Sequence, residues 1–151
     1  MSKKFPLRVL HELAQNRSDE ATRNLGSVMS EEQAMLNKLQ LLLKYRDDYR
    51  DRYRAAIKSG MNQAGWRNYQ DFLDKLEVAI EQQRAALSQS QQATAIAKEE
   101  WRNRQSRLKA YGTLNEQHER SEQQHAAKLE QREHDEIAGL AAYQGKHSSI
   151  S

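Results

Sequence analysis

Apolar residues recur every seven positions through most of this 151-residue chain, in two registers separated by a glycine-rich break. A seven-residue spacing under-winds an α-helix so that one stripe of side chains keeps facing a partner helix, which is the geometry of a left-handed coiled coil. The pattern therefore predicts an all-α chain of two long helices wound together. The first register runs through Leu7, Ala14, Ala21, Val28, Met35, Leu42, Tyr49 and Ala56, and the second through Trp66, Leu73, Ile80, Leu87, Thr94, Trp101 and Leu108.

The break between the registers predicts that the two helices run antiparallel. Gly60 and Gly65 fall within six residues of each other, and glycine adopts the positive φ that a tight turn needs. A connection this short forces neighbouring helices to run in opposite directions, so we expect one helical hairpin. The expected parts of this single domain, residues 1–151, are a helix over about 6–58, a turn over 59–65, a helix over 66–140 and a frayed tail over 141–151.

Polar residues interrupt the predicted seam between the helices at a distance from the turn. Aromatic residues and leucines occupy the corresponding seam positions near the turn. We therefore expect the packing to tighten toward the middle of the chain. The interrupting residues are Ser18, Glu32, Ser90, Thr94 and Arg104.

The composition agrees with a rod that has no multilayered core. Charged residues make up 30% of the chain and hydrophobic residues 37%, with a mean hydropathy of -1.03. The absence of cysteine leaves no disulfide framework. No stretch approaches the roughly 18 apolar residues of a membrane span, and the first residues lack the apolar run of a signal peptide. We expect a cytoplasmic protein without direct membrane insertion.

Sequence patterns typical of catalysis are missing. The chain has no glycine-rich phosphate loop, no nucleophile elbow and no His-Glu-x-x-His pair. His118 and His125 share a helix face, but seven residues of helix separate them by about 10 Å, too far to bind one metal ion. The sequence therefore predicts a protein that is not an enzyme and that binds no cofactor or metal.

The charge pattern argues against a nucleic-acid partner. The net charge is +3, but residues 44–58 hold six basic and three acidic residues, whereas residues 116–136 hold seven acidic and three basic ones. A nucleic-acid-binding helix typically carries a more continuous basic stripe.

One flank of the predicted coiled coil is unusually apolar. Tyr45 and Phe72 are large aromatic residues at positions beside the seam, close to the turn. Exposed apolar patches of this kind often mark a docking site, although residues beside a seam also commonly widen it. The same flank carries Lys38, Ala79, Ala86 and Ala93, and the edges of Leu42, Tyr49 and Leu76 complete the ridge.

The order of aromatic and polar residues around the turn resembles the FliJ family of flagellar export proteins. The resemblance covers nearly the whole chain and is most specific over residues 39–108. It rests on Trp66, Tyr69-Gln70, Phe72, Leu76-Glu77, Ala79-Ile80-Glu81-Gln82, Arg84 and Leu87, followed by Trp101-Arg102 and Gln105-x-Arg107-Leu108, and on Tyr45 and Tyr49-Arg50 before the turn.

The resemblance implies a component of the flagellar type III export apparatus, with a coiled coil similar to the central stalk of rotary ATPases. The terminal end of the hairpin is then expected to act with the hexameric export ATPase and to promote its assembly. The turn-proximal ridge is expected to contact the membrane-embedded export gate. Export chaperones are further expected partners, and the protein alone is expected to be a monomer at the inner face of the cell membrane.

The resemblance also implies a gate-binding patch. The implied patch consists of Lys38, Leu42, Tyr45, Tyr49, Phe72, Leu76, Ala79 and Gln83. Two of its positions depart from the family pattern, which has glutamine at the position of Lys38 and histidine at the position of Gln83.

Two alternative functions remain. The chain could be the stalk of a virulence-type secretion ATPase, or a generic coiled-coil scaffold that dimerises.

An elongated hairpin has a measurable length. At ~1.5 Å per residue, the expected helices are roughly 80 and 110 Å long. Small-angle X-ray scattering is expected to give a rod with a maximum dimension on the order of 100 Å. A particle with the radius of a 17.5 kDa globule would contradict this prediction.

Overall fold

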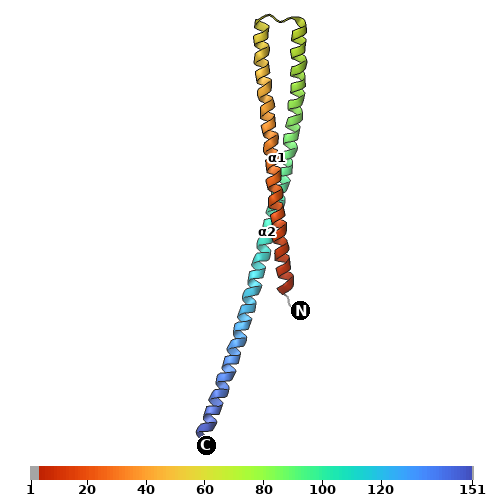
Figure 1. Cartoon of the computed structure of the whole chain (residues 1–151). Coiled ribbons are helices and arrows are strands. Elements are labelled where there is room, and N and C mark those ends of the chain that lie inside the picture. The colour runs from red at the N-terminus through yellow and green to blue at the C-terminus, as the bar shows by residue number, and fades with distance from the viewer. Residues whose placement is uncertain (1–3, 151) are drawn as a thin grey trace. The chain divides into compact units, whose positions relative to one another are not determined.

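The computed structural model describes residues 4–150, with side chains over 6–146, and contains two α-helices joined by a short turn (Figure 1). Helix α1 spans Lys4–Lys58 and helix α2 spans Gln63–Ile150. Pro6 lies in the first turn of α1, where its missing N–H needs no partner. No strand occurs over residues 4–150. The prediction of an all-α chain with two long helices is confirmed.

Contacts divide the chain into two units, which we describe separately. The first unit is Arg17–Gln105, and the second combines Met1–Asn16 with Ser106–Ser151. The first unit contains the turn and the parts of α1 and α2 that flank it.

The helices of the Arg17–Gln105 unit run antiparallel, as predicted. Near the turn the ring of Tyr53 lies against that of Tyr69, with centroids 5.5 Å apart. At the other end of the unit, Gln105 donates a hydrogen bond of 2.9 Å to the hydroxyl of Ser18. Residue numbers therefore rise along α1 as those of the facing residues fall along α2, which defines a hairpin.

Gly60 lies two residues after the end of α1, in the turn. Its φ of 85° lies in the left-handed region that side chains disfavour, and its N–H donates a 3.1 Å hydrogen bond to the carbonyl of Ile57. It is the only residue with positive φ over the described part of the chain. The prediction that glycine supplies the positive φ is therefore correct for Gly60 and wrong for Gly65.

Gly65 lies instead in the first turn of α2, because that helix begins at Gln63 and not at the predicted residue 66. The side chain of Asn62 caps the helix by accepting a 2.8 Å hydrogen bond from the Gly65 N–H. A Cβ at Gly65 would lie 3.0 Å from Cγ of Met61, so glycine allows the turn to pack closely against the helix. The early start thus follows from the asparagine cap.

The two predicted heptad registers form the interface between α1 and α2. All first-register positions are buried or half-buried, and so are all second-register positions except Trp66, which is 46% exposed in the first turn of α2. A core cluster of buried residues consists of Leu39, Leu76 and Ile80, of which Ile80 has no exposed surface. Burying a side chain of this size contributes about 1.5–3 kcal/mol, so these residues are the main apolar anchor of the hairpin. Leu42, Leu43 and Leu87 pack against the core.

Polar residues of the seam are satisfied by hydrogen bonds between the helices. The Thr94 hydroxyl donates to the carbonyl of Val28 over 3.4 Å, and Ser18 accepts from Gln105. Thr94 and Ser18 are as buried as the leucines of the core. Burial therefore does not fall off at these two positions, contrary to our expectation, because small hydroxyl side chains let the helices approach and find partners across the seam.

In the second unit, the ring of His11 lies against Gly112, where a Cβ would be 3.5 Å from Nε2 of the imidazole. Every side chain of α2 over residues 123–146 is exposed. Helix α2 continues to Ile150, ten residues beyond the predicted end near residue 140. A helical glycine costs only about 1 kcal/mol, so Gly139 and Gly145 are tolerated among the alanines around them. Residue 151 of the predicted tail lies outside the described residues.

A search of the described residues for a helix long and apolar enough to cross a membrane finds none.

The apolar core is tested by Ile80→Ala. We expect a loss of about 2–5 kcal/mol in the free energy of unfolding, since the substitution removes buried methyl groups and leaves a cavity. Val78→Ala on the same helix is the control, because Val78 is exposed and its truncation is expected to change stability by no more than ~0.5 kcal/mol. Urea unfolding followed by circular dichroism measures both. Equal effects would show that Ile80 is not a core residue.

The turn is tested by a pair of Gly→Ala substitutions. Gly60→Ala forces a Cβ into the left-handed region and is expected to cost about 1–2 kcal/mol. Gly26→Ala is expected to stabilise by about 0.5–1 kcal/mol, because Gly26 is helical and a Cβ there meets nothing within 4 Å. Thermal unfolding of the two variants should therefore shift in opposite directions. A higher melting temperature for Gly60→Ala would refute the assigned turn.

Candidate functional site near the turn

Aromatic rings from both helices come together close to the turn. The rings of Tyr49 and Phe72 have centroids 4.5 Å apart with planes inclined at 42°, and Tyr49 also lies 5.0 Å from Tyr69. Tilted contacts of this kind are favourable because a ring edge meets the face of its neighbour. Tyr53 extends the row through its own contact with Tyr69. These four rings form an aromatic cluster that packs α1 against α2 beside the turn.

The structure places the residues of the predicted gate-binding patch at different depths. Tyr45 and Phe72 are 53% and 49% exposed, and Lys38 is also exposed. Both aromatic residues therefore present surface to solvent beside the aromatic cluster. Three more residues of the patch, Leu42, Tyr49 and Ala79, are half-buried at the edge of the seam. Below we call these six residues the turn-proximal face.

Leu76 and Gln83, the other two residues of the predicted patch, are buried between the helices. Leu76 belongs to the apolar core. The side-chain amide of Gln83 donates a 3.0 Å hydrogen bond to the carbonyl of Met35 and lies 3.4 Å from its sulfur. The structure thus brings these residues next to the turn-proximal face without exposing them, and substitutions at either position act first on the seam.

The burial of Tyr49 affects its hydroxyl. Removal from water raises the pKa of Tyr49 above its ordinary value of 10.0, and the neighbouring Tyr69 raises it as well. The hydroxyl is protonated at neutral pH, as in an ordinary tyrosine, and the shift acts in the same direction. A neutral phenol at the edge of an aromatic cluster suits recognition by contact.

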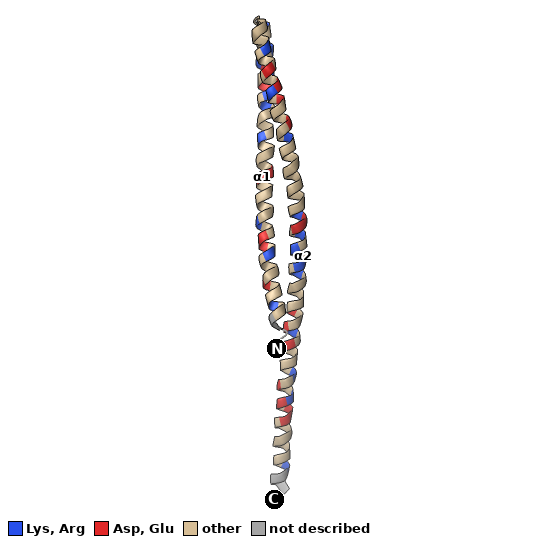
Figure 2. Cartoon of the chain, turned by 90° about the vertical axis from the view of Figure 1, so that its right-hand side faces the viewer, with Lys and Arg blue, Asp and Glu red and all other residues tan. Residues whose placement is uncertain are grey.

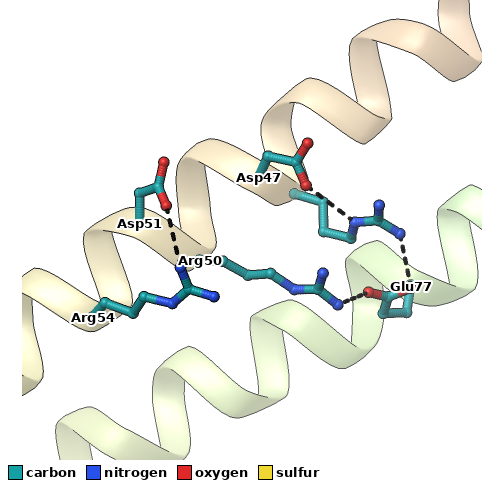
Figure 3. Close-up of polar contacts among 6 residues, drawn as sticks. Asp47, Arg50, Asp51, Arg54 and Glu77 are labelled. Atoms are coloured by element: carbon teal, nitrogen blue, oxygen red, sulfur yellow. Dashed lines mark hydrogen bonds and ion pairs between the residues drawn. The ribbon is translucent and has the colours of Figure 1, made fainter.

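A group of ion pairs joins the helices near the aromatic cluster (Figure 3). Glu77 of α2 accepts a 3.0 Å hydrogen bond from Nη2 of Arg50 and lies 3.8 Å from Nη1 of Arg46. Asp47 is 3.6 Å from Nε of Arg46, and Asp51 is 3.9 Å from Nη1 of Arg54. Only Glu77 bridges from one helix to the other within this group, so it is the electrostatic link across the seam.

The sequence analysis missed this ion-pair group. Arg50 and Glu77 occupy the flanking heptad positions opposite to those of Tyr45 and Phe72, and opposite charges at such positions commonly pair between helices. That pattern is the signal that would have found it. Partly exposed ion pairs contribute only about 0–1 kcal/mol, so this flank adds mainly to pairing specificity.

Charges of both signs are interleaved along both helices (Figure 2). Over the described residues, no three histidine, aspartate or glutamate side chains come together in a way that would hold a metal ion. His118 instead lies 3.1 Å from the carboxylate of Glu122, one helical turn away. The chemistry offered by the turn-proximal face is therefore that of a contact surface made of aromatic, aliphatic and lysine side chains.

Comparison with known proteins agrees with this arrangement of two long helices around a turn. The sequence matches the family described as "Flagellar FliJ protein" over residues 2–147. It is 33% identical over 142 residues to the Flagellar FliJ protein of Escherichia coli (strain K12), and this alignment covers 94% of the chain and 97% of the relative. The Flagellar FliJ protein of Salmonella typhi is 32% identical over the same shares of the two chains. Since the match extends over almost the whole sequence, including both helices and the turn, the chain belongs to the FliJ family of flagellar proteins.

Proposed function

We propose that this component of flagellar protein export is a non-catalytic, stalk-like link between the hexameric export ATPase and the membrane-embedded export gate. The observation that carries the proposal is that two aromatic side chains, Tyr45 and Phe72, are exposed beside the aromatic cluster near the turn. The ring of Phe72 packs on Tyr49, yet about half of the surface of Phe72 and of Tyr45 remains open to solvent, and exposed apolar surface of this kind often marks a docking site. The proposal places the protein in the cytoplasm, at the inner face of the cell membrane.

The turn-proximal face is the proposed contact with the export gate. Aromatic residues surrounded by less critical contacts dominate the binding energy of many interfaces. Phe72 is backed by Tyr49, whose ring holds it in place, so little side-chain freedom is lost on binding. Leu76 and Gln83 support this face from below, because they fix the spacing of the helices that carry it.

The residues at the ends of the chain are the proposed contact with the export ATPase. Over residues 123–146 of α2 the described side chains are exposed, and they include large apolar groups. A single helix with exposed apolar residues suits a partner that surrounds it, as a ring does. The apolar residues are Leu129, Ile137, Leu140 and Tyr143. Promotion of ATPase assembly and escort of export chaperones complete the proposed role.

Family membership favours a flagellar role over a stalk in a virulence-type secretion system, and over a generic scaffold.

The proposed action on the export ATPase is tested directly by adding the purified chain to the cognate export ATPase and measuring hexamer formation and ATP hydrolysis. We expect both to increase. A chain that forms a stable dimer by itself and leaves the ATPase unchanged would support the scaffold instead.

The gate contact is tested by Phe72→Ala and Tyr45→Ala. Each is expected to weaken binding to the gate protein by about thirtyfold, which corresponds to the ~2 kcal/mol of an interface hot spot. Tyr45→Ala should leave the helical melting curve and the stimulation of the ATPase nearly unchanged. Phe72→Ala also removes a ring contact with Tyr49, so it is expected to cost about 0.5–1.5 kcal/mol of stability while leaving the chain folded and the stimulation of the ATPase nearly unchanged. Isothermal titration calorimetry with the purified cytoplasmic part of the gate gives the affinities, and a motility assay gives the effect in cells.

Matched controls are available on each helix. Val78→Ala on α2 and Leu41→Ala on α1 remove exposed apolar side chains that do not belong to the turn-proximal face, and both are expected to bind the gate like the parental chain. Parental affinity of both aromatic variants would exclude this face as the gate contact. Loss of binding that only parallels loss of helix would show that the two rings serve the fold.

A further inference from the structure

The end of the hairpin, residues 50–67, concentrates positive charge. It contains five basic residues and one acidic residue, a net charge of +4, whereas the whole chain carries +3. This segment, which we call the hairpin tip, is therefore strongly positive for its length. Arg50 and Arg54 are engaged in the ion pairs with Glu77 and Asp51.

The other three basic residues of the hairpin tip are available to a partner. Arg52, Lys58 and Arg67 are exposed, and none of them forms an ion pair with an acidic side chain of the described residues. Lys58 is the last residue of α1, and Arg67 lies in the first turns of α2. The tip thus offers three uncompensated cationic groups from both sides of the turn.

Apolar side chains at the hairpin tip surround a shallow hollow. Ile57 and Trp66 are about half exposed, at 48% and 46%, and line the hollow together with Met61, Asn62 and Gln63. Met61 is held in place because its side chain packs on Gly65, where no Cβ intervenes. Hydrogen bonds from Gly60 to Ile57 and from Trp66 to Asn62 order the turn. The apolar surface is therefore built into an ordered turn.

We propose that the hairpin tip binds the surface of a bilayer that contains anionic phospholipids. Tryptophan favours the headgroup level of a membrane, where its ring is apolar on one side and its N–H meets polar groups. Arginine and lysine around it are attracted by the negative potential of the phosphates. The three uncompensated basic residues of the tip and its exposed Trp66 combine both properties, and this pairing of charge with an interfacial aromatic residue points to lipid headgroups as the partner.

Contact at the surface is the mode that the tip allows. The turn between the helices is short, and no helix in the described part of the chain meets the requirements for a membrane span. A nucleic-acid partner would call for a longer basic track than this tip provides, because acidic residues resume on both sides of it. The proposal does not depend on the gate contact, since it uses residues outside the turn-proximal face.

The experiment uses the full chain and vesicles of two compositions, phosphatidylcholine alone and phosphatidylcholine mixed with phosphatidylglycerol. We expect co-sedimentation with the mixed vesicles only, and release at high salt, because salt screens the attraction between exposed charges. In a Trp101→Phe background, Trp66 is the only tryptophan. Its fluorescence should shift to shorter wavelength with the mixed vesicles and stay unchanged with phosphatidylcholine.

Two sets of variants assign the contact to the hairpin tip. Arg52→Gln, Lys58→Gln and Arg67→Gln combined should lower the partition coefficient by about a hundredfold, since each basic residue near an anionic surface contributes roughly fivefold. Lys98→Gln, Arg107→Gln and Lys109→Gln combined are the matched control, because this triple variant changes the net charge equally and leaves the tip intact. Trp66→Ser is expected to weaken binding even at low salt.

Circular dichroism of each variant must show the parental helix content. The proposal is overturned if the chain ignores the mixed vesicles, if it binds both compositions equally, or if the two triple variants lose binding equally. It is also overturned if the tip variants bind vesicles like the parental chain but lose binding to the gate protein, since the tip would then be a protein contact.

Discussion

The packing of α1 against α2 is the interaction on which the rest of the Arg17–Gln105 unit depends. No second layer covers either helix there, so nearly all of the apolar burial comes from one narrow seam. A long helix in water has little stability of its own, and its persistence relies on tertiary packing of one face. Ile80, Leu39 and Leu76 supply the apolar part of that packing at its best-buried point. Every surface feature discussed above is carried by these two helices and is held in place by the seam.

Polar groups inside the seam select the alignment of the helices, whereas the leucines mainly provide apolar burial. Apolar side chains pack favourably in more than one heptad register, whereas a buried amide or hydroxyl is satisfied only when its partner stands opposite. Gln83 finds the carbonyl of Met35, and Gln105 finds the hydroxyl of Ser18. A slip by one heptad would separate Gln105 from the hydroxyl of Ser18, which is the side-chain partner that this alignment provides. The seam thus selects one alignment of the helices, and this alignment brings the rings of Tyr49 and Phe72 together.

The two flanks of the hairpin differ in chemistry. One flank carries Arg50 and Glu77, whose ion pair joins the helices, and the other leaves Tyr45 and Phe72 exposed. Two polar residues of the predicted patch also differ in their surroundings. Gln83 is buried, and its amide is hydrogen-bonded inside the hairpin, so it bears on the seam. Lys38 is exposed and adds positive charge at the rim of the proposed gate contact.

The sequence by itself determined the all-α fold, the two heptad registers and the place of the turn, because these follow from local spacing and from the φ preference of glycine. It also determined which residues share a helix face. Only the tertiary structure decided that Leu76 and Gln83 are buried while Tyr45 and Phe72 are exposed. It alone decided that Ser18 and Thr94 are hydrogen-bonded to the opposite helix inside the seam. The depth and partners of a side chain depend on which residues of the other helix stand opposite, and that alignment is a property of the packed pair.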